Sequence, residues 1–321
     1  MAHNIRNVHE PKCWESLNIP SYNEQGNHLK QLQLEVWMGR QAGHHYIPAS
    51  YLAGFTMDNN KSAQFCVVPV DGKKTYKTSP TNVCKSRDYY SLPGLADSLS
   101  IEKFYATDIE PKIKLTLDFM ENNKSIPSKE DLTGLFLLGA TLWLRNPKRR
   151  NLLTENLLYI ENFIDDGLSD GIKVTNRHKL MATKGNIISA ELTSLKIAIN
   201  SFSNKHFQLF ISEPSQKFIT SDNPCYISHR DMMKGIYLGL DTPENEICFP
   251  INKNMAVIAR NEPCKQSTFK ADEKFVSLLN TKIAGTAQRY FFTAEDSVLL
   301  LDKEMKTYEH LFKSSESWHQ K

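Results

Sequence analysis

Apolar residues recur at helical spacing through the middle of the chain. Phe104 and Tyr105 follow Ile101 by three and four residues, and the same spacing continues through much of the region that follows. Side chains three and four residues apart share one face of a helix. We therefore predict helices between about residues 100 and 163, and a further helix over 186–202.

Short apolar stretches before and after this region predict strands. The first, residues 64–70, is followed by Asp71-Gly72 and a second extended stretch, which predicts a hairpin. Pro69 cannot donate a backbone hydrogen bond, so we expect this strand at a sheet edge. Further elements are predicted as strands at 207–211, 217–220, 247–250, 255–260 and 290–293, a short extended piece at Tyr89-Tyr90, and a helix over 269–288.

Helices in the middle and strands on both sides predict an α+β fold, in which a central helical bundle packs against a mostly antiparallel sheet. Residues 1–40 are largely polar, and we predict an N-terminal arm there with a helix over 29–38. Residues 41–321 are predicted to form one domain, because no linker rich in Gly, Ser or Pro divides them. A subdivision near residue 202 is the alternative.

Composition limits the classes of function. The chain has 321 residues, 39 of them basic and 36 acidic, and its net charge of +3 is too small to indicate nucleic-acid binding by bulk charge. Its longest apolar run, residues 132–144, is shorter than the roughly 20 residues that cross a bilayer, so we predict a buried core helix there. No apolar segment follows the first residues as in a signal peptide, and we predict a cytoplasmic protein without membrane contact.

Six cysteines are scattered through the chain without a C-x-x-C pair. This spacing does not favour a zinc knuckle or a redox dithiol, and we predict buried free thiols. A zinc site that combines Cys84 or Cys225 with distant histidines is the alternative.

The segment Gly43-His44-His45-Tyr46-Ile47-Pro48 is the first candidate for chemistry. Pro48 is suited to open a helix, which would place both histidines at its N-terminal end. In one interpretation the rings only satisfy backbone groups there. In the other, one ring binds a metal or a phosphate and its neighbour acts as a base; the helix dipole favours the phosphate.

The histidine segment resembles the start of the ββα-metal (HNH-like) nuclease motif at His44, His45 and Pro48. That resemblance implies a histidine that activates water beside a metal-bound phosphate. In that family an Asn follows within a short hairpin, whereas Asn82 lies 37 residues beyond His45.

Two further segments combine apolar and polar residues. Ser221, Asp222 and Asn223 follow a predicted strand; they either form an Asx turn, or Asp222 serves as a metal ligand or base with its neighbours as hydrogen-bonding partners. Residues 143–150 place four basic side chains at a helix break. They either form a solvated surface, or Arg145 turns inward to hold a phosphate or Asp222, with Lys148 and Arg149 beside it.

Taken together, the histidine segment, residues 79–83, 145–147 and 218–224, and Asn280 with Arg289 resemble the HHYVP-type family of domains of unknown function, found in bacteria and fungi. The match covers residues 43–293. It implies a shared site to which the histidine pair, Asn82, Arg145 and Asp222 contribute. Arg289 must then lie past the end of the helix that carries Asn280.

These observations lead to the hypothesis of a metal-dependent, nuclease-like phosphodiester hydrolase acting on nucleic acid or a nucleotide. His45 is expected to be the general base, His44 and Asp222 to hold Mg²⁺ or Mn²⁺ rather than Zn²⁺, and Arg145 to steady the phosphate. Substrate contacts are expected from Asn82, Ser221, Asn223, Lys148 and Arg149. A non-catalytic module that binds a nucleotide or another phosphorylated ligand is the alternative, and a purely structural protein is the third.

Overall fold

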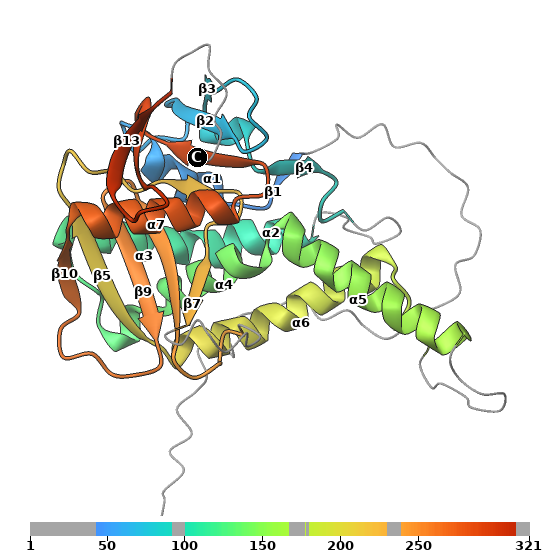
Figure 1. The fold of residues 1–321 in the computed structure, drawn as a ribbon. Coiled ribbons are helices and arrows are strands. Elements are labelled where there is room, and N and C mark those ends of the chain that lie inside the picture. The colour runs from blue at the N-terminus through green and yellow to red at the C-terminus, as the bar shows by residue number, and fades with distance from the viewer. Residues whose placement is uncertain (1–42, 92–99, 167–176, 178–179, 230–238, 313–321) are drawn as a thin grey trace, which may run out of the picture.

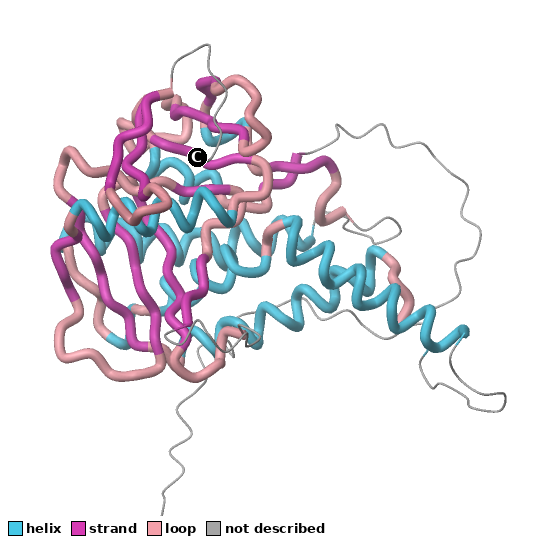
Figure 2. Tube along the Cα trace, viewed as in Figure 1, coloured by secondary structure: helices cyan, strands magenta, loops and turns pink. Residues whose placement is uncertain are grey.

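The computed structural model describes residues 43–91, 100–166, 177, 180–229 and 239–312. The predicted arm over residues 1–40, with its helix, lies outside the described residues. The described chain forms an α+β fold, as predicted (Figure 1). Figure 2 shows the strands of the two larger sheets gathered at one side of the molecule, while helices lie behind them and extend to the other side.

The larger sheet has five strands in the order β10-β5-β9-β8-β7. β9 has its predicted bounds, and β5 and β8 extend beyond theirs by a few residues. All neighbours are antiparallel except β10 and β5, which are parallel. The strands are β5 (His206–Ser212), β7 (Tyr226–His229), β8 (Asn245–Asn252), β9 (Met255–Arg260) and β10 (Thr268–Ala271).

The second sheet has four antiparallel strands in the order β3-β2-β11-β6. The hairpin of β2 and β3 confirms the prediction. The expected edge position of β2 was wrong, because β2 lies between two strands; Pro69 is tolerated since β3 pairs only with Phe65–Val67, which leaves the strand end open on that side. The strands are β2 (Phe65–Pro69), β3 (Tyr76–Thr78), β6 (Thr220–Ser221) and β11 (Tyr290–Thr293).

β6 is shorter than the predicted strand over 217–220. The backbone N–H of Ile219 donates to the Oδ1 atom of Asn280 at 3.0 Å, and that of Phe218 donates to the carbonyl of Lys253 at 2.8 Å. These bonds satisfy the backbone before a ladder with β11 begins at Thr220.

Helices fill the middle of the chain as predicted. Almost every residue of α4 is buried, which confirms a core helix at the longest apolar run. In the part of the chain that the structure describes, no helix has the length and apolar character to span a bilayer. The helices are α2 (Ser100–Phe104), α3 (Glu110–Asn123), α4 (Thr133–Leu144), α5 (Pro147–Asp166) and α6 (Lys184–Ser203).

Two glycines let α4 approach its neighbours closely. A Cβ atom added at Gly134 would lie 2.3 Å from the carbonyl oxygen of Lys112 in α3, and one at Gly139 would lie 2.6 Å from the ring of Phe202 in α6. Real Cβ atoms do not approach that closely, so the positions of all three helices depend on these glycines.

Two predicted elements were wrong. The region expected as one helix over 269–288 is the strand β10 followed by α7 (Glu273–Thr286), because the side chain of Asp272 accepts the N–H of Phe275 at 2.7 Å and caps the helix there. The extended piece lies at β4 (Lys85–Arg87), and Tyr89-Tyr90 follows it in a turn that begins at Asp88, whose φ is 51°.

The remaining described elements frame the two sheets. α7 lies across the upper ends of the five-stranded sheet, beside the hairpin of β12 (Ser297–Leu301) and β13 (Thr307–Leu311) (Figure 1). The larger of two buried hydrophobic clusters contains residues from both sides of residue 202, among them Leu138 and Phe249. The division of the chain into an arm and a single domain stays a prediction.

Candidate functional site

His44 and His45 lie in the strand β1 (Gly43–His45), not at a helix start as predicted. The helix α1 (Ala49–Leu52) begins only after Pro48, whose ψ of 128° is extended rather than helical. β1 pairs antiparallel with β4, so that His44 lies opposite Ser86 and His45 opposite Lys85. Successive side chains in a strand point to opposite faces, and the two rings therefore face different surroundings.

The ring of His44 is a hydrogen-bond donor in this arrangement. Its Nδ1 atom accepts the backbone N–H of Tyr90 at 3.0 Å, which leaves the ring proton on Nε2. The side chain is 1% exposed, and Nε2 has no hydrogen-bond partner among the described residues. Burial lowers the pKa of His44, which agrees with a neutral ring. This geometry offers no lone pair for the metal that the sequence assigned to His44.

His45 lies in different surroundings. Burial lowers its pKa, and the Thr81 backbone opposes that effect. Nε2 is buried and has no hydrogen-bond partner among the described residues. A neutral imidazole keeps a lone pair on one ring nitrogen, so the ring can accept a proton. Lys85, Arg145 and Lys61 all lower the same pKa, so each acts on the ring as a positive charge.

Arg145 does turn inward, and it lies next to the backbone of the histidine pair. It follows the last residue of α4 and is fully buried. Its Nη2 atom donates to the carbonyl of His45 at 2.6 Å, and its Nε atom donates to the hydroxyl of Tyr90 at 3.0 Å. The guanidinium carbon lies 3.7 Å from the ring centre of Tyr105. Arg145 thus contacts the histidine strand rather than Asp222.

Two glutamates approach the same guanidinium. Glu102 lies 3.9 Å from Nη2 of Arg145 and Glu110 lies 4.0 Å from Nη1, distances too long for direct hydrogen bonds. Burial raises the pKa of both carboxyl groups, and Arg145 opposes that shift. The π-helical turn Tyr105–Ile109 joins α2 to α3, and its wider winding brings both glutamates to one face.

Tyr90 connects this cluster to α6. Its hydroxyl donates to Glu191, which is 1% exposed, at 2.7 Å. The other Glu191 oxygen accepts the Nε–H of Arg150 at 2.9 Å, and the Arg150 guanidinium lies over the ring of Tyr89. A buried chain of polar contacts therefore runs from α6 through Tyr90 and Arg145 to the backbone of β1.

Buried polar atoms without partners concentrate around Arg145. Of eleven such side-chain atoms among the described residues, six belong to the Arg145 cluster. By this name we mean Arg145 and the residues around it: His44, His45, Tyr89, Tyr90, Glu102, Tyr105, Glu110, Arg150 and Glu191. Unpaired buried polar groups are rare and costly, and each calls for an explanation such as water, an ion, strain or a catalytic role. The six are His44 Nε2, His45 Nε2, Tyr89 OH, Glu102 Oε2, Tyr105 OH and Arg145 Nη1.

Asp222 is held elsewhere by backbone groups. Its carboxylate accepts the N–H groups of Gln288 and Arg289, both at 2.8 Å, and of Tyr290 at 3.3 Å. Burial raises its pKa, against the opposing effect of these bonds. The Oγ atom of Ser221 accepts the N–H of Asn223, so the turn is made by a serine rather than by Asp222 or Asn223 as in the Asx turn weighed from the sequence. The hydrogen bonds of Asp222 link the residues after β6 to the start of β11, and the use of this segment in binding stays a prediction.

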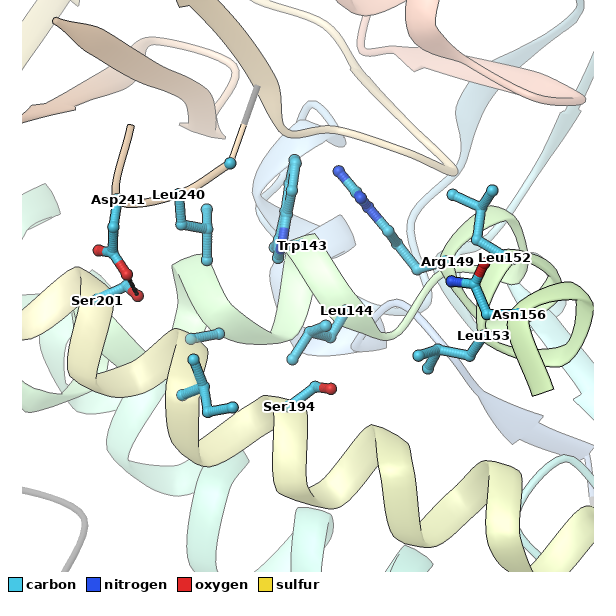
Figure 3. Close-up of a pocket in the computed structure, with 13 residues that line it drawn as sticks. Trp143, Leu144, Arg149, Leu152, Leu153, Asn156, Ser194, Ser201, Leu240 and Asp241 are labelled. Carbon is cyan, nitrogen blue, oxygen red and sulfur yellow. Dashed lines mark hydrogen bonds between the residues drawn. The ribbon is translucent and has the colours of Figure 1, made fainter. Parts of the chain in front are cut away.

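The other predicted contact residues lie apart from the Arg145 cluster. Asn82 is exposed and donates to Thr78 and Ser79 within its own turn. Lys148 is exposed as well. Arg149 lies over the indole of Trp143, with its guanidinium carbon 3.4 Å from the ring centre. Figure 3 shows these two side chains in a cavity of about 630 Å³ between α4, α5 and α6.

Metal ligation has no ready-made centre among the described residues. No group of three or more His, Cys, Asp and Glu side chains comes together there in a way that could hold an ion. Cys84 and Cys225 are buried free thiols, and burial raises the pKa of each.

Sequence reasoning missed the groups that surround Arg145. Glu191 carried a usable signal, because it is a charged residue within the apolar stripe formed by Ile188, Leu192 and Leu195. Glu102 and Tyr105 carried none, because the π-helical turn that aims them has no pattern that distinguishes it from an ordinary helix.

The profile of a protein family of unknown function, DUF4238, matches residues 43–297. The chain belongs to this family. The DUF4238 region begins with β1, includes the whole Arg145 cluster and ends at the start of β12. No curated protein and no solved structure matches the chain. DUF4238 membership agrees with the predicted resemblance to a domain of unknown function, while the HHYVP-type label and the ββα-metal likeness stay predictions.

Proposed function

We propose that the chain hydrolyses phosphodiesters, with nucleic acid or a nucleotide as substrate and His45 as general base. The observation that carries the proposal is the state of the His45 ring. Burial lowers its pKa, which favours the neutral form, and its buried Nε2 atom has no hydrogen-bond partner among the described residues. A base prepared in this way can accept a proton without first losing another contact.

The charges around His45 favour an anionic substrate. Lys85 lies directly opposite His45 in the ribbon of β1 and β4, and residues in opposite positions share a face. Arg145 and Lys61 add two further positive charges within electrostatic reach of the ring. A phosphate group placed there would gain from all three charges and would keep His45 close to the reacting centre.

The chemical step then needs one water molecule. Its oxygen forms a bond to phosphorus while its proton passes to Nε2 of His45. The ester P–O bond breaks, and the leaving oxygen takes a proton from solvent. Arg145 is a positioning residue in this scheme, because its Nη2 atom holds the His45 carbonyl. Of its three side-chain nitrogen atoms, only Nη1 lacks a hydrogen-bond partner among the described residues.

We propose that a divalent cation takes part, but at other residues than the sequence suggested. Mg²⁺ in phosphate-processing sites is commonly held by one or two carboxylates, the substrate phosphate and water. Glu102 and Glu110 are the carboxylates beside Arg145, and we assign the cation to them rather than to His44 and Asp222. Mn²⁺ would be accepted by the same oxygen ligands.

The test is hydrolysis of a chromogenic phosphodiester and of short DNA and RNA by the full-length protein with Mg²⁺ or Mn²⁺. We expect turnover by the wild type and a loss of about 10²–10⁴-fold in kcat/KM for His45→Gln, the usual contribution of a general base. His206→Gln, which changes an exposed histidine on β5, serves as the control and should keep full activity. A folded His45→Gln protein with undiminished activity, or a wild type inactive on the whole panel, would contradict the proposal.

A second candidate is a non-catalytic module for a phosphorylated ligand. It is favoured by the contacts that already occupy Arg145 and Asp222, because these contacts give both groups a role in holding the fold together. It predicts stabilisation of the fold by phosphate or a nucleotide, with neither turnover nor a requirement for metal.

A further inference from the structure

A cavity of about 260 Å³ is lined by Lys61, whose charge also acts on His45. It is bounded by α1 and the short helical turn that follows it, by residues 59–61, by α3, and by the end of β8. Its volume falls just below the range of typical small-molecule sites, about 300–1,000 Å³, and suits one compact organic group.

The cavity has an apolar floor and a polar rim that carries hydrogen-bond donors and the carboxylates of Asp118 and Glu121. Tyr51, Ile113 and Ile251 are buried and form the floor. On the rim, the Oδ1 atom of Asn60 accepts the N–H of Ser62 at 2.8 Å, and that of Asn252 accepts the N–H of Asn254 at 2.9 Å.

These two bonds fix the orientation of both amides. Because a backbone N–H can only donate, the bonded atom of each side chain is the oxygen, and each Nδ2 group remains available as a donor. The Oγ atom of Ser50, on the same rim, is buried and has no hydrogen-bond partner among the residues that the structure describes. An apolar floor with both donors and carboxylate acceptors around it suits a flat ring whose edge carries acceptor and donor atoms, as a nucleobase does.

Lys61 connects the cavity to His45. It lines the cavity, and its charge acts on both His45 and Glu110. A phosphate held between Lys61 and His45 would therefore leave the rest of its ester at the mouth of the cavity.

We propose that this cavity receives the nucleoside part of the substrate, with the base on the apolar floor and its acceptor atoms toward Ser50, Asn60 and Asn252. The inference rests on the proposed function, because the phosphate must lie beside His45 for the nucleoside to reach the cavity. It narrows the substrate class to phosphate esters of single nucleoside units or of a chain end, rather than to internal positions of a polymer.

The experiment compares the affinity of the full-length protein for inorganic phosphate and for a panel of nucleoside monophosphates by calorimetry. At least one nucleotide should bind at least about tenfold more tightly than phosphate, a difference of about 1.4 kcal/mol. Ser50→Val fills part of the cavity and removes a donor. It should abolish the advantage of that nucleotide and leave the affinity for phosphate within about twofold of wild type.

Ser194→Val is the matched control, because Ser194 is a half-buried helical serine that lines the separate cavity of Figure 3. It should behave as wild type. If phosphate binds and no nucleotide binds better, the nucleoside site is wrong while the proposed function stands. If neither phosphate nor any nucleotide binds, then the nucleoside site, the phosphate site and the proposed function are all wrong. Nucleotide binding by Ser50→Val at wild-type strength would also overturn the inference. The comparison of phosphate with nucleotide affinity uses the wild-type protein and therefore does not require that this variant folds.

Discussion

The two adjacent histidines differ in the surroundings of their rings. His44 accepts the backbone N–H of Tyr90 at Nδ1, which fixes its proton on Nε2, whereas the Thr81 backbone opposes the lowering of the pKa of His45 by burial. Sequence alone presents two equivalent residues. The difference arises from the alternation of a strand and from the segments on either side of β4 that carry Thr81 and Tyr90.

Protonation of His44 should make stability depend on pH. Burial lowers its folded-state pKa below the ordinary value of 6.5, so in the interval between the two values the unfolded chain binds more protons. The free energy of unfolding should therefore fall as the pH drops below about 6.5. His44→Asn keeps an acceptor near the position of Nδ1 and does not titrate, so its stability should fall less.

Urea unfolding at about pH 7.5 and about pH 5.5 measures this dependence for both proteins. His45 titrates in both, since burial also lowers its pKa, and its contribution cancels in the comparison. An equal fall in the two proteins would show that His44 does not carry the effect.

At the scale of secondary-structure elements, the position of α4 depends on Gly134. In Gly134→Ala the new methyl group would lie 2.3 Å from the Lys112 carbonyl, so α3 and α4 must move apart. We expect destabilisation of about 1–3 kcal/mol, because this clash outweighs the gain of about 1 kcal/mol in helix propensity. Chemical denaturation gives the value. Gly285→Ala, at an exposed position of α7, should be neutral or slightly stabilising, and equal effects at the two glycines would contradict the packing argument.

Elements with strong local patterns were predictable from the sequence. The apolar run of β9, the bounds of β11 and the apolar face of α6 depend on short-range spacing, and each was found as predicted. β1 and β10 were not, because both are short and neither contains a continuous apolar run. Pro48 does directly precede α1, but it carries no signal for a strand that ends at His45.

At the scale of the whole molecule, Asp222 ties together segments 66 residues apart. Asp222→Asn would turn an amide NH₂ toward at least one of three backbone donors. We expect a loss of about 1–3 kcal/mol in the free energy of unfolding for each donor left unpaired in this buried site. Asp296→Asn, which removes an exposed ion pair with Lys77, is the control and should cost less than about 1 kcal/mol. A stable but inactive Asp222→Asn protein would instead favour the role in catalysis that the sequence suggested.

The Arg145 cluster combines groups from β1, α2, α3, α6 and the turn after β4, and this assembly sets the limit of sequence reasoning. From the sequence, polar residues in conspicuous motifs could be chosen as candidates, and two of them, Arg145 and His45, are in contact. Which of the other polar groups join them depends on tertiary contacts, as Tyr90 and Glu191 show. Asp222, equally conspicuous in sequence, serves a different part of the fold.

The π-helical turn at Tyr105–Ile109 lies between α2, which carries Glu102, and α3. The direction in which Glu102 points relative to α3 therefore depends on the number of residues in this turn. Each residue in an α-helix turns the chain by about 100°. Deleting one residue from this turn would convert it to ordinary helix and swing Glu102 away from Arg145, with no change to either side chain. Relatives that alter the sequence of the turn can keep the cluster, whereas relatives that alter its length cannot.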